Sequence, residues 1–144
     1  MNHYYYYYYY YYFLRRLQSV LNTAVRLVTG ASRREHVTSL LRDRHWLPIQ
    51  QRVDYKLCMM VHRCLSGSAP SYLVDLIMPS AVANARAGLR SAEAKTVSLP
   101  RTYSSLGDRA FAVTAPRAWN KLPFVLRNTT SVGSTSRKLK TFFI

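Results

Sequence analysis

Apolar residues recur at helical spacing near the start of the chain. Six of them fall on one side of a helix: Leu14, Leu17, Leu21, Ala24, Val25 and Val28. Arg15, Asn22 and Arg26 fall on the other side, and Gly30 suits the left-handed residue that follows a helix. The pattern therefore predicts an amphipathic helix over residues 13–29.

The strongest helix prediction covers residues 48–65. Pro48 suits the first turn of this helix and Gly67 its far end. Six residues form a wide apolar stripe along it: Ile49, Val53, Leu57, Met60, Val61 and Cys64. At about 100° per residue, four others share a different face: Arg52, Lys56, Met59 and Arg63. A shorter helix is expected over residues 37–44.

The stretch Gly107–Pro123 combines Phe, Pro and Trp in an order that amphipathicity alone does not produce. Pro116 suits the first turn of a short helix, because its missing N–H would have no partner there anyway. Trp119 and Leu122 are three residues apart and can face one core, and Pro123 ends the turn.

Shorter elements are predicted elsewhere. Residues 72–78 suit one or two helical turns, and residues 79–95, poor in bulky side chains, suit a mobile linker. Thr96–Leu99 alternate like a short strand that could pair with Ala110–Thr114. Residues 134–143 suit a basic helix with apolar positions at its end.

Together these elements predict a mainly α fold, a small and partly open helical domain of four or five helices with a minor two-stranded β element. The predicted organisation is a poly-Tyr low-complexity segment at 1–12, a helical region at 13–78, a flexible linker at 79–95, and the β element, Pro/Trp helix and basic C-terminal helix at 96–144. The expected core residues are Trp46, Leu57, Met60, Phe111 and Trp119.

The net charge is the feature of the composition that most changes the interpretation of this chain. Among 144 residues, 21 Lys and Arg stand against 6 Asp and Glu, giving a formal net charge of +15. Small domains are soluble at a net charge of about 2–8, so the excess indicates a polyanionic partner. The candidate nucleic-acid-binding residues are Arg15, Arg26, Arg52, Lys56, Arg63, Arg137, Lys138 and Lys140. A plain solvated face is the alternative for Arg52, Lys56 and Arg63, whose like charges repel one another.

A run of tyrosines, Tyr4 to Tyr12, precedes the first predicted helix. It lacks the basic start and apolar core of a signal peptide, and the uncharged residues 1–14 are too few for a membrane span. The simplest interpretation is a translated triplet repeat. The alternative is a stacking strip for single-stranded bases, and the composition also carries an aggregation hazard.

The sequence contains no recognisable catalytic constellation. None of its acids forms an adjacent Asp-Asp pair, and no nucleophile elbow, phosphate-cradling glycine loop or zinc-protease motif is present. Cys58 and His62 are four residues apart, but two ligands do not make a zinc site. Cys58 and Cys64 are expected to be buried, reduced thiols of a cytoplasmic or nuclear protein. We therefore expect no enzyme activity, cofactor, metal or small-molecule substrate.

Three motifs occur in a fixed order. They are Arg33-Arg34-Glu35-His36-Val37-Thr38; His45-Trp46-Leu47-Pro48-Ile49 followed by Arg52, Tyr55-Lys56-Leu57, Leu65, Gly67, Ala69-Pro70, Tyr72-Leu73 and Asp75-Leu76; and G-D-R-A-F…A-P-R-A-W-N-K-L-P at 107–123. In this order and spacing they resemble the C-terminal tail of LINE-type non-LTR retrotransposon polyproteins, downstream of the reverse transcriptase domain. The resemblance covers residues 17–144.

Full-length members of that family are RNA-directed DNA polymerases that nick target DNA and extend the nick while copying their own RNA. The aromatic-Ala-Asp-Asp turn of the polymerase and the endonuclease residues are missing from this sequence. The resemblance therefore implies an inactive remnant whose basic faces would contact RNA or an RNA–DNA hybrid. Two alternatives stay open: an independent small basic RNA- or DNA-binding module, and an interfacial amphipathic protein that binds anionic lipid through residues 13–29 and 134–144.

Overall fold

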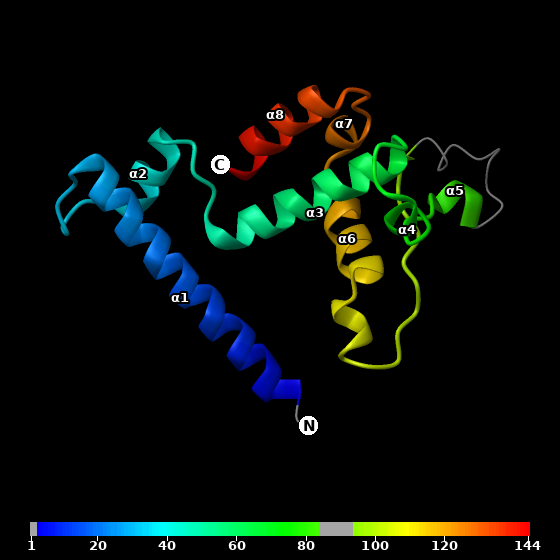
Figure 1. The fold of residues 1–144 in the computed structure, drawn as a ribbon, viewed down its shortest axis with the longest axis horizontal. Helices are drawn as coiled ribbons and strands as arrows, with labels where there is room; N and C mark the ends of the chain where they lie inside the picture. The colour runs from blue at the N-terminus through cyan, green and yellow to red at the C-terminus, as the bar shows by residue number, and fades with distance from the viewer. Residues whose placement is uncertain (1–2, 84–93) are drawn as a thin grey trace. The chain divides into compact units, whose positions relative to one another are not determined.

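The computed structural model describes residues 3–83 and 94–144, and most of these residues are helical (Figure 1). The α-helices in the described residues are α1 (His3–Thr29), α2 (Val37–Asp43), α3 (Ile49–Leu65), α4 (Ser71–Val74), α5 (Ser80–Ala83), α6 (Phe111–Asn120), α7 (Phe124–Arg127) and α8 (Val132–Phe143). The prediction of a mainly α fold is confirmed. The chain divides into two compact units, residues 1–53 with 142–144 and residues 54–141.

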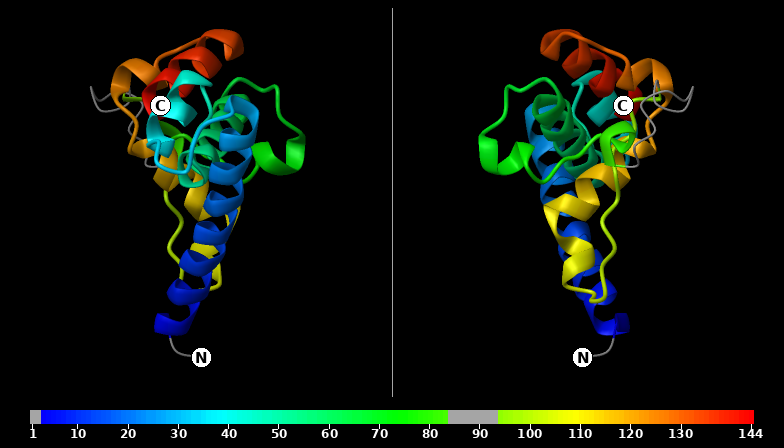
Figure 2. Two further views of the ribbon diagram at one scale, coloured as in Figure 1. Left: turned by 90° about the vertical axis from the view of Figure 1, so that its left-hand side faces the viewer. Right: turned by 90° about the vertical axis from the view of Figure 1, so that its right-hand side faces the viewer.

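The first helix, α1, is longer than predicted. It begins at His3 instead of Phe13, so the tyrosine run continues the helix, which stays unbroken in the further views of Figure 2. Its end is as predicted, because Gly30 has a φ of +68° and the N–H of Ala31 donates to the carbonyl of Arg26 (3.2 Å). The predicted apolar face is only partly buried, with Val25 at 0% exposure and Val28 at 59%.

Side-chain hydrogen bonds hold the rest of the first unit to α1. The guanidinium of Arg26 donates to the backbone carbonyls of Ser32 and Glu35 and so fixes the turn before α2. The side-chain oxygen of Gln18 accepts from the N–H of Ile49 at the start of α3 (2.9 Å). These two polar residues anchor segments that the apolar pattern alone does not connect to α1.

Trp119 forms the centre of the second unit. Its side chain is fully buried, and its indole N–H donates to the carbonyl of Lys95 (2.9 Å). Leu122 is buried beside the end of the same helix, as predicted. The other expected core residues are only partly buried: Trp46, Leu57, Met60 and Phe111. A chain of this size has too much surface for its volume to enclose all of its large side chains.

The helix that carries Trp119 differs from the prediction at its start. α6 begins at Phe111, because the carbonyl of Ala110 accepts from the N–H groups of Val113 and Thr114 (both 3.0 Å). Pro116 therefore lies inside the helix instead of in its first turn, and its buried ring fills part of the core. The prediction of a strand at 110–114 is wrong for the same reason.

Val97 pairs with different partners from those predicted. Its backbone N–H and carbonyl bond to the side-chain amide of Asn120 (2.9 and 2.8 Å), which takes the place of a neighbouring strand. Val97 also forms an isolated antiparallel bridge with Pro79. The predicted two-stranded β element is therefore not formed between 96–99 and 110–114.

The segment predicted to be a linker, 79–95, begins with ordered structure. Pro79 forms the bridge to Val97, and Ser80–Ala83 form α5. Residues 84–93 lie outside the described part of the chain, so the predicted mobility of that stretch is untested. The helix predicted over 72–78 is limited to the single turn of α4.

The helix α3 agrees closely with its prediction. It ends as expected, since Gly67 has a φ of +68° and the N–H of Ser68 donates to the carbonyl of Arg63 (2.9 Å). Within the second unit, α8 lies along α3 (Figure 1), joined by a hydrogen bond between the hydroxyls of Tyr55 and Ser136 (2.8 Å). This arrangement gives α3 a covered inner face and an open outer face.

Candidate nucleic-acid interface

The outer face of α3 carries the three cations that its periodicity predicted. Arg52, Lys56 and Arg63 are all exposed, with the partly buried Met59 on the same face. Within residues 3–83 and 94–144 none of the three forms an ion pair; the ion pair seen there joins Arg117 to Asp108 at 3.8 Å. The three cations therefore keep their charge available to a partner.

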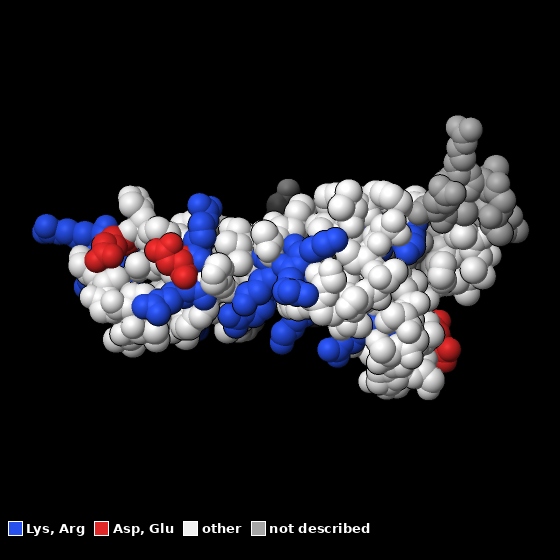
Figure 3. Space-filling model, turned by 90° about the horizontal axis from the view of Figure 1, so that it is seen from above, with Lys and Arg blue, Asp and Glu red and all other residues white. Residues whose placement is uncertain are grey.

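A second set of cations lies on α8. Arg137, Lys138 and Lys140 are exposed, whereas Leu139 between them is fully buried. The buried leucine and the hydrogen bond to Tyr55 fix which side of α8 faces inward, so its charges are held on the solvent side. Lys and Arg far outnumber Asp and Glu on the face drawn in Figure 3.

The two predicted arginines of α1 have different surroundings. Arg15 is exposed, and its guanidinium lies over the ring of Tyr11, 5.7 Å from the centroid. Arg26 uses its guanidinium on the carbonyls of Ser32 and Glu35, as described above. The structure therefore gives Arg26 a role in supporting a loop, while Arg15 remains open to a ligand.

The inner face of α3 holds a buried polar cluster that the sequence did not indicate. His62 is 4% exposed, and its Nε2 lies 3.1 Å from the carbonyl oxygen of Thr129 and 2.9 Å from the hydroxyl of Thr135. Because a carbonyl oxygen can only accept, we assign the ring proton to Nε2. The two threonines are 67 and 73 residues away along the chain, so no local pattern could have paired them with His62.

The cysteines follow the prediction of buried, reduced thiols. Cys58 and Cys64 are both buried and form no disulfide. Burial, together with the negative charge of Asp54, raises the pKa of Cys58 to about 12. The thiol is therefore a weak nucleophile, since the thiolate is the reactive form. In the described residues no group of three or more His, Cys, Asp or Glu is arranged to hold a metal ion.

In the described part of the chain, no helix is both long enough and apolar enough to cross a bilayer. Comparison with family models, with curated proteins and with solved structures gives no match. The resemblance to the retrotransposon tail therefore stays a prediction that depends on the three motifs.

Proposed function

We propose that this chain binds the backbone of RNA or DNA without sequence preference, through the outer face of α3 and the cations of α8. We further propose that it is an enzymatically inactive remnant of a non-LTR retrotransposon polyprotein. The observation that carries the binding proposal is the row Arg52, Lys56 and Arg63, exposed on one helix face with no acidic partner in the described residues.

Backbone binding follows from the electrostatics of such a row. Arg52 and Lys56 lie one helical turn apart and repel each other, and Arg63 lies two turns beyond Lys56. A phosphate chain that bridges the row would relieve the repulsion and release its own counterions. Each phosphate contact contributes a slope of about −0.9 on duplex DNA, or −0.7 on single strands, to log K against log salt. Affinity should be similar for unrelated sequences, because contacts to phosphates carry no base information.

The triple variant R52Q/K56Q/R63Q tests this proposal. We expect its salt slope for a mixed-sequence duplex to be flatter than the wild-type slope by about two to three units, because three phosphate contacts are lost. Gln retains the helix propensity of the residues it replaces. The measurement is fluorescence anisotropy of a labelled duplex over a series of salt concentrations.

The matched control is R33Q/R34Q/R44Q, which removes the same charge from three exposed arginines on the turns around α2. Its slope should stay close to wild type. Equal flattening in both triple variants would show that net charge alone drives binding, and an unchanged slope in R52Q/K56Q/R63Q would reject the α3 face as the interface.

A second function, attachment to an anionic membrane surface, is favoured by one observation. Several large apolar side chains of α1 are 53–79% exposed: Phe13, Leu17, Val20, Leu27 and Val28. At about 100° per residue they share one arc of the helix, which could insert among lipid headgroups. Flotation with phosphatidylserine vesicles tests this: L17Q/L27Q should then abolish lipid binding and leave duplex binding unchanged.

A further inference from the structure

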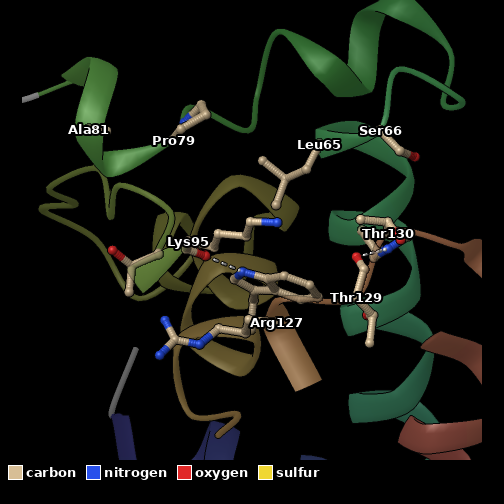
Figure 4. Close-up of a pocket in the computed structure, with 11 residues that line it drawn as sticks. Leu65, Ser66, Pro79, Ala81, Lys95, Arg127, Thr129 and Thr130 are labelled. Carbon is tan, nitrogen blue, oxygen red and sulfur yellow. Dashed lines mark hydrogen bonds between the residues drawn. The ribbon is translucent and has the colours of Figure 1, made fainter. Parts of the chain in front are cut away.

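The second unit contains a cavity of about 360 Å³ with two cations in its walls (Figure 4). Arg127, the last residue of α7, and Lys95, two residues before Val97, reach it from separate segments. The hydroxyl residues Ser66, Thr129 and Thr130 also line it, and Trp119 forms part of the wall. Its volume is within the range of small-molecule sites, about 300–1,000 Å³.

Arg127 is the residue that points to a ligand. Arg127 is only partly exposed, and its Nε and Nη1 are buried without a hydrogen-bond partner in the described residues. The guanidinium of arginine stays protonated in proteins, so it cannot become neutral when it is buried. A buried charge is unfavourable unless it is paired. An anion in the cavity would supply the partner that these two nitrogens lack among the described residues.

Lys95 adds a second, independent feature. Its backbone has a φ of +48°, which is uncommon for a residue other than glycine. The hydrogen bond from the Trp119 indole to the Lys95 carbonyl holds that conformation. Backbone conformations of this kind gather at ligand sites, where the surrounding structure maintains them. Here the conformation places a second positive charge at the cavity that Arg127 lines.

We propose that this cavity binds the phosphate of a nucleotide-sized ligand. The guanidinium fork of Arg127 matches two phosphate oxygens, Lys95 adds a second positive charge to the lining, and the Thr130 hydroxyl can donate. The hydroxyls of Ser66 and Thr129 already donate to the carbonyls of Arg63 and Leu126. The apolar residues Leu65 and Pro79 offer a surface to the organic part of the ligand. The phosphate can belong to a free nucleotide or to the end of a nucleic-acid strand.

The test uses the full chain with a W46F substitution, so that Trp119 alone reports binding by its fluorescence. We expect saturable titration with adenosine monophosphate, weaker binding of inorganic phosphate, and none of adenosine. R127Q should weaken the affinity for adenosine monophosphate by about 10- to 100-fold, the usual effect of losing charge-assisted hydrogen bonds. K95Q, at an exposed position, should weaken it less, by about tenfold or below.

Two controls separate this site from the outer face of α3. R137Q removes one exposed arginine from α8 and should leave the affinity for adenosine monophosphate unchanged. R52Q/K56Q/R63Q should also leave the affinity for adenosine monophosphate unchanged while it flattens the salt slope for duplex binding. The two proposals can therefore fail independently, and the measurements show which one has failed. Circular dichroism checks the fold of R127Q. If R127Q does not fold, the affinity of K95Q for adenosine monophosphate is the test instead.

Competition identifies the source of the phosphate. Displacement of adenosine monophosphate by a 5′-phosphorylated oligonucleotide, but not by its 5′-hydroxyl form, would assign the site to strand ends. No displacement by either would assign it to free nucleotides. Absence of saturable binding by wild type, or equal loss in R137Q and R127Q, would overturn the proposal.

Discussion

The two faces of α3 show how one helix can carry two kinds of polar group with opposite consequences. On the outer face, Lys56 and Arg63 are exposed and hydrated. On the inner face, His62 is buried and makes hydrogen bonds to residues far along the chain. Removing a hydrated charge leaves nothing unsatisfied, whereas removing a buried donor leaves its acceptors without a partner. The outer face can therefore serve binding, while the inner face is committed to stability.

The comparison is sharpest for His62. We expect His62→Ala to lower the free energy of unfolding by about 3 kcal/mol, because it strands the Thr129 carbonyl and opens a cavity in the core. The ring also packs near Trp119, at 6.3 Å between centroids, so that contact is lost as well. Urea unfolding followed by circular dichroism measures the change.

Lys56→Ala is the matched control for His62→Ala, on the same helix but facing solvent, and it should change stability by no more than about 0.5 kcal/mol. His62→Gln places an amide donor near the position of Nε2 and should recover part of the loss. Equal effects of His62→Ala and Lys56→Ala would contradict the division between the two faces.

Cys58, also on the inner face, should make stability depend on alkaline pH. Burial raises the pKa of Cys58 from 9.0 to about 12, so the neutral thiol is favoured by folding. That stabilisation is complete below pH 9 and is lost as the pH rises toward 12. Between pH 8 and pH 10 we expect a loss of about 1.4 kcal/mol in the free energy of unfolding.

Urea unfolding at the two pH values measures this loss, and C58A should reduce it by the same amount while lowering stability at both. The native thiol should also resist iodoacetamide at pH 8.5. A C58A protein with the wild-type pH dependence would show that another group is responsible.

The sequence predicted those parts of the fold that depend on local pattern. The apolar stripe of α3, its exposed cations and the glycines at positive φ, Gly30 and Gly67, were all visible in the order of residues. The start of α6 was not, because an alternating segment such as 110–114 suits a strand or a helix equally until its partners are known. Val97 pairs with the side chain of Asn120, a contact that no periodicity encodes.

The candidate sites divide in the same way. Arg52, Lys56 and Arg63 could be grouped from sequence because one helix fixes their spacing. Arg127 could not be found, because the residues that line the same cavity, among them Lys95 and residues of α3, are far from it along the chain. Long-range packing decides which residues surround Arg127, and no local pattern in the sequence encodes that packing.

On the outer face itself, R52Q, K56Q and R63Q should each change the free energy of unfolding by less than about 0.5 kcal/mol. All three side chains are exposed and lack ion pairs in the described residues, so only hydrated charge is lost. Thermal unfolding at low salt would detect a slight stabilisation, because the repulsion between neighbouring cations is relieved. A loss of several degrees would show that these residues pack against the protein.

The smallest effect on stability is expected from deletion of the tyrosine run, whose exposed side chains are aromatic instead of charged. Tyr8 to Tyr12 are 41–69% exposed although they lie on a regular helix. Deleting Tyr4–Tyr12 should leave the melting temperature nearly unchanged, because α1 keeps Gln18, Val25 and Arg26, through which it is joined to the rest of its unit. A drop of several degrees would show that the tyrosines pack against the protein, and a weakened affinity for single-stranded RNA with unchanged stability would show that they stack on bases. With neither change, the run is a helical extension without a role in folding or binding, as a translated triplet repeat would be.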